Sequence, residues 1–117
     1  MKIQVNPGSH TAGSVELTSQ VEAVVERALG RFRDRITRVE VHLTDEPGAH
    51  KSGGHEKRCV MEARLAGLQP IAVSAEGSTL DQVLDGAAHK LEKTLQRTLG
   101  RLDDPKGRTS YAGDQTT

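Results

Sequence analysis

The sequence predicts an α+β fold in which a four-stranded mixed sheet carries two helices on one face, in the order β-α-β-β-β-α. Two segments repeat apolar residues with the spacing of a helix, and four shorter segments alternate apolar and polar residues as half-buried strands do. At 117 residues the chain has room for one domain with one modest core. Because the chain has one Phe, one Tyr and no Trp, that core must consist of Val, Leu, Ile and Ala.

The N-terminal third of the chain predicts one strand and one helix. Residues 2–6 alternate polar and apolar side chains, which is typical of a short strand. We expect the helix to begin at residues 18–19, since Ser19 and Glu22 have the spacing of a capping box. One face of this helix is apolar over three turns and consists of Val21, Val24, Val25, Ala28, Leu29 and Phe32.

The middle of the chain predicts three further strands. The first covers residues 37–44, and its inward side consists of Val39, Val41 and Leu43. Residues 45–56 contain three Gly and one Pro and are expected to form a loop. Residues 57–66 and 69–76 follow as a hairpin with a tight turn at Gly67. Because a helix joins the first two strands, these should be parallel, and the later strands antiparallel.

The last element is a long helix. Thr79 and Gln82 have the spacing of a capping box, and Pro105 is expected to end the helix. Its apolar face consists of Leu80, Val83, Leu84, Ala87, Leu91, Leu95 and Leu102. We therefore expect one folded domain over residues 1–104, followed by a disordered tail over residues 105–117, where apolar periodicity stops.

The composition limits the compartment and the chemistry. A single cysteine cannot form an internal disulfide. No apolar run approaches the ~20 residues that cross a bilayer, and no signal peptide is visible. We therefore expect a cytoplasmic protein without a membrane partner. His55 and Cys59 have metal-ligand spacing only in a helix, whereas in a strand they would lie about 13 Å apart. No nucleotide-binding or nucleophile motif is present. We expect no enzyme activity, metal, cofactor or small-molecule substrate, and a buried Cys59.

The charges leave two interpretations open. Sixteen basic and sixteen acidic residues cancel, whereas a nucleic-acid-binding domain is normally basic overall. On the last helix, however, four basic residues fall within about 80° of arc: Lys90, Lys93, Arg97 and Arg101. Arg27 and Arg31 form a similar pair on the first helix, which predicts a basic groove between the helix ends. These residues either form ordinary solvated faces or contact successive phosphates of an RNA.

A family resemblance favours the second interpretation. It rests on residues 15–18 with the helix ending at residues 29–32, on residues 36–43, and on residues 71–77 followed by 84–86 and 90–95. These segments resemble the bacterial family of hibernation-promoting factors and ribosome-associated inhibitors, over roughly residues 1–102. The resemblance is to the short form of the family, which lacks a second, ribosome-pairing domain, and the chain is a divergent member, since Asp81 stands where an aromatic residue is common.

The resemblance implies a fold and a function. Members fold like a double-stranded-RNA-binding domain with an extra first strand. They occupy the mRNA and tRNA channel of the small ribosomal subunit, contact ribosomal RNA, and block translation under stress or in stationary phase. The family's basic positions match Arg31, Lys90, Lys93, Arg97 and Arg101. The alternative is a divergent member that acts as a protein-interaction module, either by self-association or through the solvent face of its sheet, where Arg38, Glu40, His42, Glu62 and Arg64 carry mixed charge.

Overall fold

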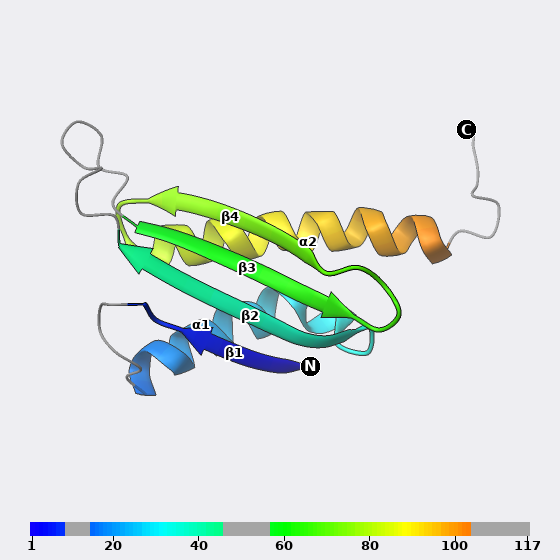
Figure 1. Cartoon of the computed structure of the whole chain (residues 1–117), viewed down its shortest axis with the longest axis horizontal. Coiled ribbons are helices and arrows are strands. Elements are labelled where there is room, and N and C mark those ends of the chain that lie inside the picture. The colour runs from blue at the N-terminus through cyan, green and yellow to red at the C-terminus, as the bar shows by residue number, and fades with distance from the viewer. Residues whose placement is uncertain (9–14, 46–56, 104–117) are drawn as a thin grey trace.

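The structure is a computed structural model that describes residues 1–8, 15–45 and 57–103. Its elements are β1 (Lys2–Asn6), α1 (Val15–Leu29), the 3₁₀ turn η1 (Gly30–Phe32), β2 (Ile36–Asp45), β3 (Lys57–Leu65), β4 (Ile71–Gly77) and α2 (Leu80–Asp103). The predicted α+β fold with the order β-α-β-β-β-α is confirmed (Figure 1). The expected tail at 105–117 and most of the expected loop at 45–56 lie outside the described residues.

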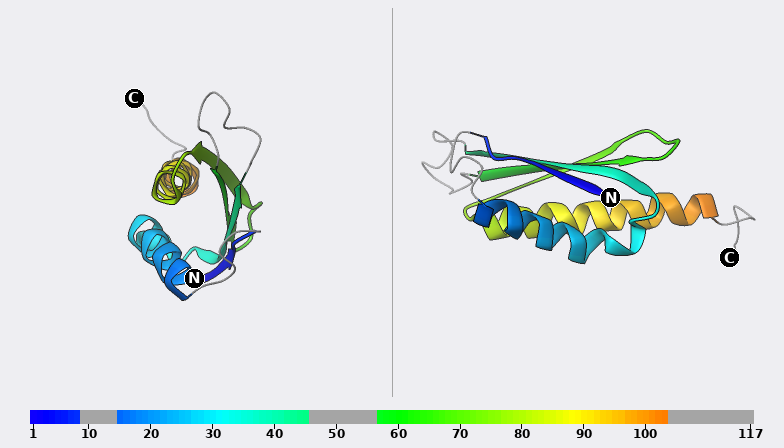
Figure 2. Two further views of the ribbon diagram at one scale, coloured as in Figure 1. Left: turned by 90° about the vertical axis from the view of Figure 1, so that its left-hand side faces the viewer. Right: turned by 90° about the horizontal axis from the view of Figure 1, so that it is seen from below.

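The four strands form one mixed sheet in the order β1-β2-β3-β4. β1 runs parallel to β2, and β2, β3 and β4 are antiparallel neighbours, as the sequence predicts. Both helices cover the same face of this sheet, with α1 on the side of β1 and α2 on the side of β4 (Figures 1 and 2). The molecule therefore has a helical face, an open sheet face and two chemically distinct outer edges.

The core lies between the sheet and the helices. The predicted inward residues of β2, which are Val39, Val41 and Leu43, are buried. Strand register aligns Val41 with Met61 of β3, and Met61 with Val73 of β4, so that one apolar row crosses the sheet. Cys59 is fully buried in this layer, and its burial raises the pKa of the thiol to about 12. The prediction that Cys59 is a small buried hydrophobe is confirmed.

The beginning of α2 follows the predicted capping box. The Thr79 hydroxyl accepts a hydrogen bond from the Gln82 N–H at 3.2 Å, and the Gln82 side-chain oxygen accepts one from the Thr79 N–H at 3.4 Å. The same oxygen accepts a bond from the Ser78 N–H at 3.0 Å. Because only two residues separate β4 from α2, this cap fixes how the helix turns back along the strand. Gly86 then lets α2 approach closely, since an added Cβ there would lie 3.2 Å from Ala75.

Two sequence predictions about the helices are wrong. α1 begins at Val15, so Ser19 lies inside the helix instead of capping it. Leu17, only 5% exposed, extends the apolar face one turn upstream. On α2, Leu102 is 55% exposed, and Leu99, 3% exposed, is buried instead. Leu102 has the correct spacing for the apolar face, but the end of α2 extends past the β3–β4 hairpin and has no sheet beneath it (Figure 1).

Candidate nucleic-acid interface

Two sides of α2 make different contacts. On one side the Lys90 ammonium donates a hydrogen bond of 2.7 Å to the carbonyl oxygen of Ser74, at the outer edge of β4. On the other side the Glu92 carboxylate accepts a bond of 3.3 Å from the Arg31 guanidinium of α1. Two residues rotate a helix by about 200°, which is why positions 90 and 92 point to opposite neighbours. The side of α2 next to β4 is therefore basic, and the side next to α1 carries an acid.

The basic side forms a continuous ridge, which we define as Lys90, Lys93, Arg97 and Arg101. All four side chains are exposed, and Glu92 is the only acidic residue between positions 90 and 101. Within the described part of the chain, no carboxylate lies at ion-pair distance from Lys93, Arg97 or Arg101. The bond from Lys90 to a neutral carbonyl leaves its positive charge intact. At 1.5 Å per residue, Lys93 and Arg101 lie about 12 Å apart along the helix.

The groove between the two helices has mixed charge. It is a hollow of about 380 Å³ lined by Arg27, His89, Asp85 and Glu92 together with Val24, Ala28 and Ala88. Arg31, at the end of α1, is paired with Glu92, and its guanidinium lies 4.7 Å from the centre of the Phe32 ring. The prediction of a basic groove between the helix ends is therefore wrong. The structure brings the four ridge residues together and places Arg27 and Arg31 on the far side of α2.

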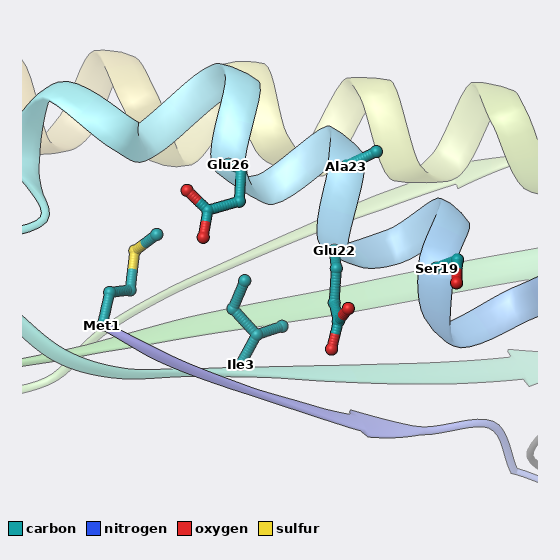
Figure 3. Close-up of a pocket in the computed structure, with 6 residues that line it drawn as sticks. All are labelled: Met1, Ile3, Ser19, Glu22, Ala23 and Glu26. Carbon is teal, nitrogen blue, oxygen red and sulfur yellow. The ribbon is translucent and has the colours of Figure 1, made fainter. Parts of the chain in front are cut away.

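The opposite edge of the molecule carries two neighbouring carboxylates. A hollow of about 430 Å³ lies between β1 and α1, lined by Met1, Ile3, Ser19, Glu22, Ala23 and Glu26. The carboxylates of Glu22 and Glu26 both face this hollow (Figure 3). Its lining also includes Met1 with the positively charged chain terminus, the exposed Lys2 follows on β1, and Glu26 pairs with Arg33. The β1 edge thus combines carboxylates with cations, whereas the ridge at the β4 edge carries cations alone.

The open face of the sheet holds a balanced network of charges. Glu40 lies at its centre and contacts the guanidinium of Arg38 at 3.0 Å, the His42 ring at 3.4 Å and the guanidinium of Arg64 at 3.9 Å. Arg64 also reaches Glu62 at 3.7 Å. The predicted outward placement of these side chains is confirmed. Arg38 and Arg64 each have a carboxylate partner here, and among the described residues only Arg58 of β3 on this face has none, so this face presents less free positive charge than the ridge.

Within residues 1–8, 15–45 and 57–103, no three His, Cys, Asp or Glu side chains come together in a geometry that could hold a metal ion. His50 and His55 lie outside these residues. In the same part of the chain, neither helix is long and apolar enough to span a bilayer.

A sequence model of the family described as Sigma 54 modulation protein / S30EA ribosomal protein matches residues 9–103, which is most of the chain. The chain belongs to this family. The resemblance found from the sequence is thereby confirmed, and the ridge lies within the matched region. A search of curated proteins finds no match.

Solved structures of similar fold support the architecture of this ribosome-associated family. A ribosomal subunit interface protein from Coxiella burnetii superposes with a TM-score of 0.64 at 23% identity, covering 86% of this chain and 99% of that one. The N-terminal domain of Protein Y from Thermus thermophilus gives a TM-score of 0.65 at 22% identity, covering 84% of this chain and 99% of that one. At such identities the likeness establishes the fold.

One feature of this surface was not predicted from the sequence. An apolar cleft of about 380 Å³ adjoins Arg101 at the end of the ridge, between the β3–β4 hairpin and the last turns of α2. The available signal was Leu68, a large apolar side chain within a tight turn, where polar residues or Gly are typical.

Proposed function

We propose that this S30EA-family protein is a non-catalytic translational inhibitor that binds the small ribosomal subunit. It would occupy the channel for mRNA and tRNA, in the bacterial cytoplasm, under stress or in stationary phase. The observation that supports this best is the run of exposed cations at Lys93, Arg97 and Arg101, which have no carboxylate partner among the described residues, in a protein whose net charge is zero. A neutral protein with one basic edge binds phosphates through that edge.

The six basic residues would contribute unequally. Lys93, Arg97 and Arg101 would contact successive phosphates of ribosomal RNA, because no bond has to be broken to free them. Lys90 donates a hydrogen bond to the Ser74 carbonyl, so its ammonium group would attract a phosphate while it stays at the edge of β4. Arg27 and Arg31 lie across α2, and Arg31 is already paired with Glu92. We therefore expect these two to make weaker, peripheral contacts.

The inhibition itself would be steric. The sheet and both helices pack around one core, and binding through one edge would leave the rest of this body in the path of mRNA and tRNA. The β1 edge mixes the carboxylates of Glu22 and Glu26 with cations and would attract phosphates less than the ridge does, so that the β4 edge faces the RNA. No bond is made or broken in this mechanism, and no cofactor takes part.

Co-sedimentation with purified small subunits tests the proposal. The wild type should sediment with the subunits at low salt and be released as salt rises, because counterions compete for the phosphates. Lys93→Ala and Arg97→Ala should each weaken binding and lower the slope of log affinity against log salt by about one. Lys2→Ala is the matched control, since it removes an exposed cation from the opposite edge.

Two outcomes would contradict this function. One is a wild-type protein that stays at the top of the gradient at low salt. The other is a Lys2→Ala effect as large as that of Lys93→Ala. In the first case the charge network around Glu40 would favour the second candidate, a protein-binding module that uses the open sheet face. Arg64→Glu should then abolish binding of the partner protein while ridge variants leave it unchanged.

A further inference from the structure

The apolar cleft at the end of the ridge is exposed and has no partner in the structure. It is lined by Leu65, Leu68, Gln69, Pro70, Ile71, Thr98, Arg101 and Leu102. Leu68 is 39% exposed and Leu102 is 55% exposed, which makes them two of the three large apolar side chains exposed in the described residues. Both point to the same cleft from different elements.

The backbone geometry places Leu68 at the cleft. The hairpin turns over Leu65–Leu68, closed by a bond from the Leu68 N–H to the Leu65 carbonyl at 3.3 Å. Gly67 adopts a φ of 76°, the left-handed value that a type II turn needs at its third position. This turn would form equally well with a polar residue at position 68. The leucine therefore adds exposed apolar surface that the turn does not need.

The cleft is continuous with the phosphate-binding ridge. Arg101 belongs to the ridge and also lines the cleft, and Arg97 lies one turn earlier on the same side of α2. Gln69 adds an amide that can both donate and accept a hydrogen bond. An apolar slot with an arginine and an amide at its rim matches the chemistry of a nucleotide, which combines a flat apolar base, polar base edges and an anionic phosphate.

We propose that this cleft binds one unpaired base of the RNA held by the ridge. The base would insert between the side chains of Leu68 and Leu102, with its edge toward Gln69 and its phosphate on Arg101. Apolar side chains and arginine planes hold extruded bases in this way. The inference rests on the proposed function and adds that the bound RNA is single-stranded at the C-terminal end of the ridge.

Other occupants fit the cleft less well. A stable interface between two proteins takes about 20–30 residues from each side. The eight residues around this cleft, one of them an unpaired arginine, fall far short of that. A second copy of the chain would also bring two basic ridges close together. An unpaired nucleotide needs only the small surface that is present and complements its charge.

The first test measures binding to purified small subunits across a salt series. The double variant Leu68→Ala/Leu102→Ala should bind about tenfold more weakly with an unchanged salt slope, because it removes base contacts and no phosphate contact. Val15→Ala is the matched control, since Val15 is the third exposed apolar residue and lies at the start of α1. Equal melting temperatures for all variants would show that the fold is intact.

The outcomes separate this inference from the proposed function. A double variant that binds like the wild type, while Lys93→Ala still weakens binding, overturns the cleft inference alone. A wild type that does not bind subunits at all overturns both. A concentration-dependent dimer that disappears in the double variant would assign the cleft to a second copy and overturn the inference as well.

A second measurement distinguishes a base from a ribosomal protein side chain. The probes are a single-stranded oligoadenylate and an abasic RNA of the same length, compared at low salt. The wild type should prefer the strand with bases by about tenfold, and the double variant should lose this preference. Equal binding of both strands by the wild type, or binding of neither, overturns the inference.

Discussion

The two outer edges of this molecule differ in charge although they share one sheet. At the β1 edge, Glu22 and Glu26 of α1 face a hollow beside the strand. At the β4 edge, the ridge of α2 carries cations that no described carboxylate approaches. Across four strands these edges lie about 14 Å apart, which exceeds the ~8 Å over which salt screens charges at physiological strength. The total charge of the chain therefore says nothing about what either edge attracts.

Between the edges, the charges cancel locally. Arg31 of α1 pairs with Glu92 of α2, and the hollow next to them combines Arg27 with Asp85. The helical layer thus has paired or mixed charges at the β1 side and at the centre, and unpaired cations of the ridge at the β4 side. A binding partner rich in phosphates would meet attraction at one edge only, which is a more restrictive arrangement than a uniformly basic surface.

The largest effect on stability is expected from a substitution in the core, because both edges are built on it. Leu91 is fully buried on α2, so Leu91→Ala should lower the free energy of unfolding by about 2–5 kcal/mol. Leu102→Ala is the control and should change it by less than about 0.5 kcal/mol, because that side chain is exposed. Denaturant unfolding measures both. The buried Cys59 thiol offers a second readout, since it should react with a thiol reagent only in molecules that open. Similar losses in the two variants would contradict the assignment of the core.

The next prediction compares the two edges directly. Lys93→Glu/Arg97→Glu should lower affinity for small subunits at least about 100-fold, since it replaces two phosphate contacts with repulsion. The opposite reversal at the other edge, Glu22→Lys/Glu26→Lys, should change affinity by less than about threefold, because salt screens it from the bound RNA. Equilibrium binding at physiological salt measures both. A large gain from the second variant would mean that the β1 edge also faces RNA.

A smaller effect on stability is expected at the helix starts, because Thr79 caps α2 whereas Ser19 lies inside α1. Thr79→Ala removes the hydroxyl that caps α2 and should cost about 1 kcal/mol of stability. Ser19→Ala should cost little, because Ser19 lies within α1 and is exposed there. Thermal unfolding of the two variants is the measurement. A larger loss for Ser19→Ala would restore the predicted helix start at that residue.

The sequence predicted what depends on local periodicity. Strand alternation and the apolar faces of both helices identified all six elements, because each face must be buried against the same sheet. The first helix was predicted to begin too late, since the capping box at Ser19 was given more weight than Leu17, which has the right spacing to extend the apolar face. Leu102 has the right spacing too, but no periodicity indicates where the sheet beneath a helix ends.

The candidate site was predictable only in part, because spacing along one helix can be seen in the sequence and the packing between elements cannot. The ridge lies on one helix, so its spacing alone groups its residues. Whether an arginine elsewhere joins it depends on helix packing: Arg31 and Glu92 are 61 positions apart in sequence, and nothing local indicates that they meet. The cleft next to Arg101 depends equally on the hairpin lying beside the last turns of α2.

The smallest effect is expected for the ion pair between Arg31 and Glu92, which lies between the two edges. Arg31 and Glu92 are an exposed pair, so a double-mutant cycle with Arg31→Ala and Glu92→Ala should give a coupling of about 0.5 kcal/mol or less in the free energy of unfolding. Glu92→Gln should nevertheless raise affinity for small subunits by up to about threefold, because it frees Arg31 and removes the carboxylate nearest the ridge along α2. Asp85→Asn is the matched control, since it removes a carboxylate from the same groove two turns earlier. If Glu92→Gln left affinity unchanged while ridge variants reduced it, Arg31 would lie outside the RNA contact and the interface would end at α2.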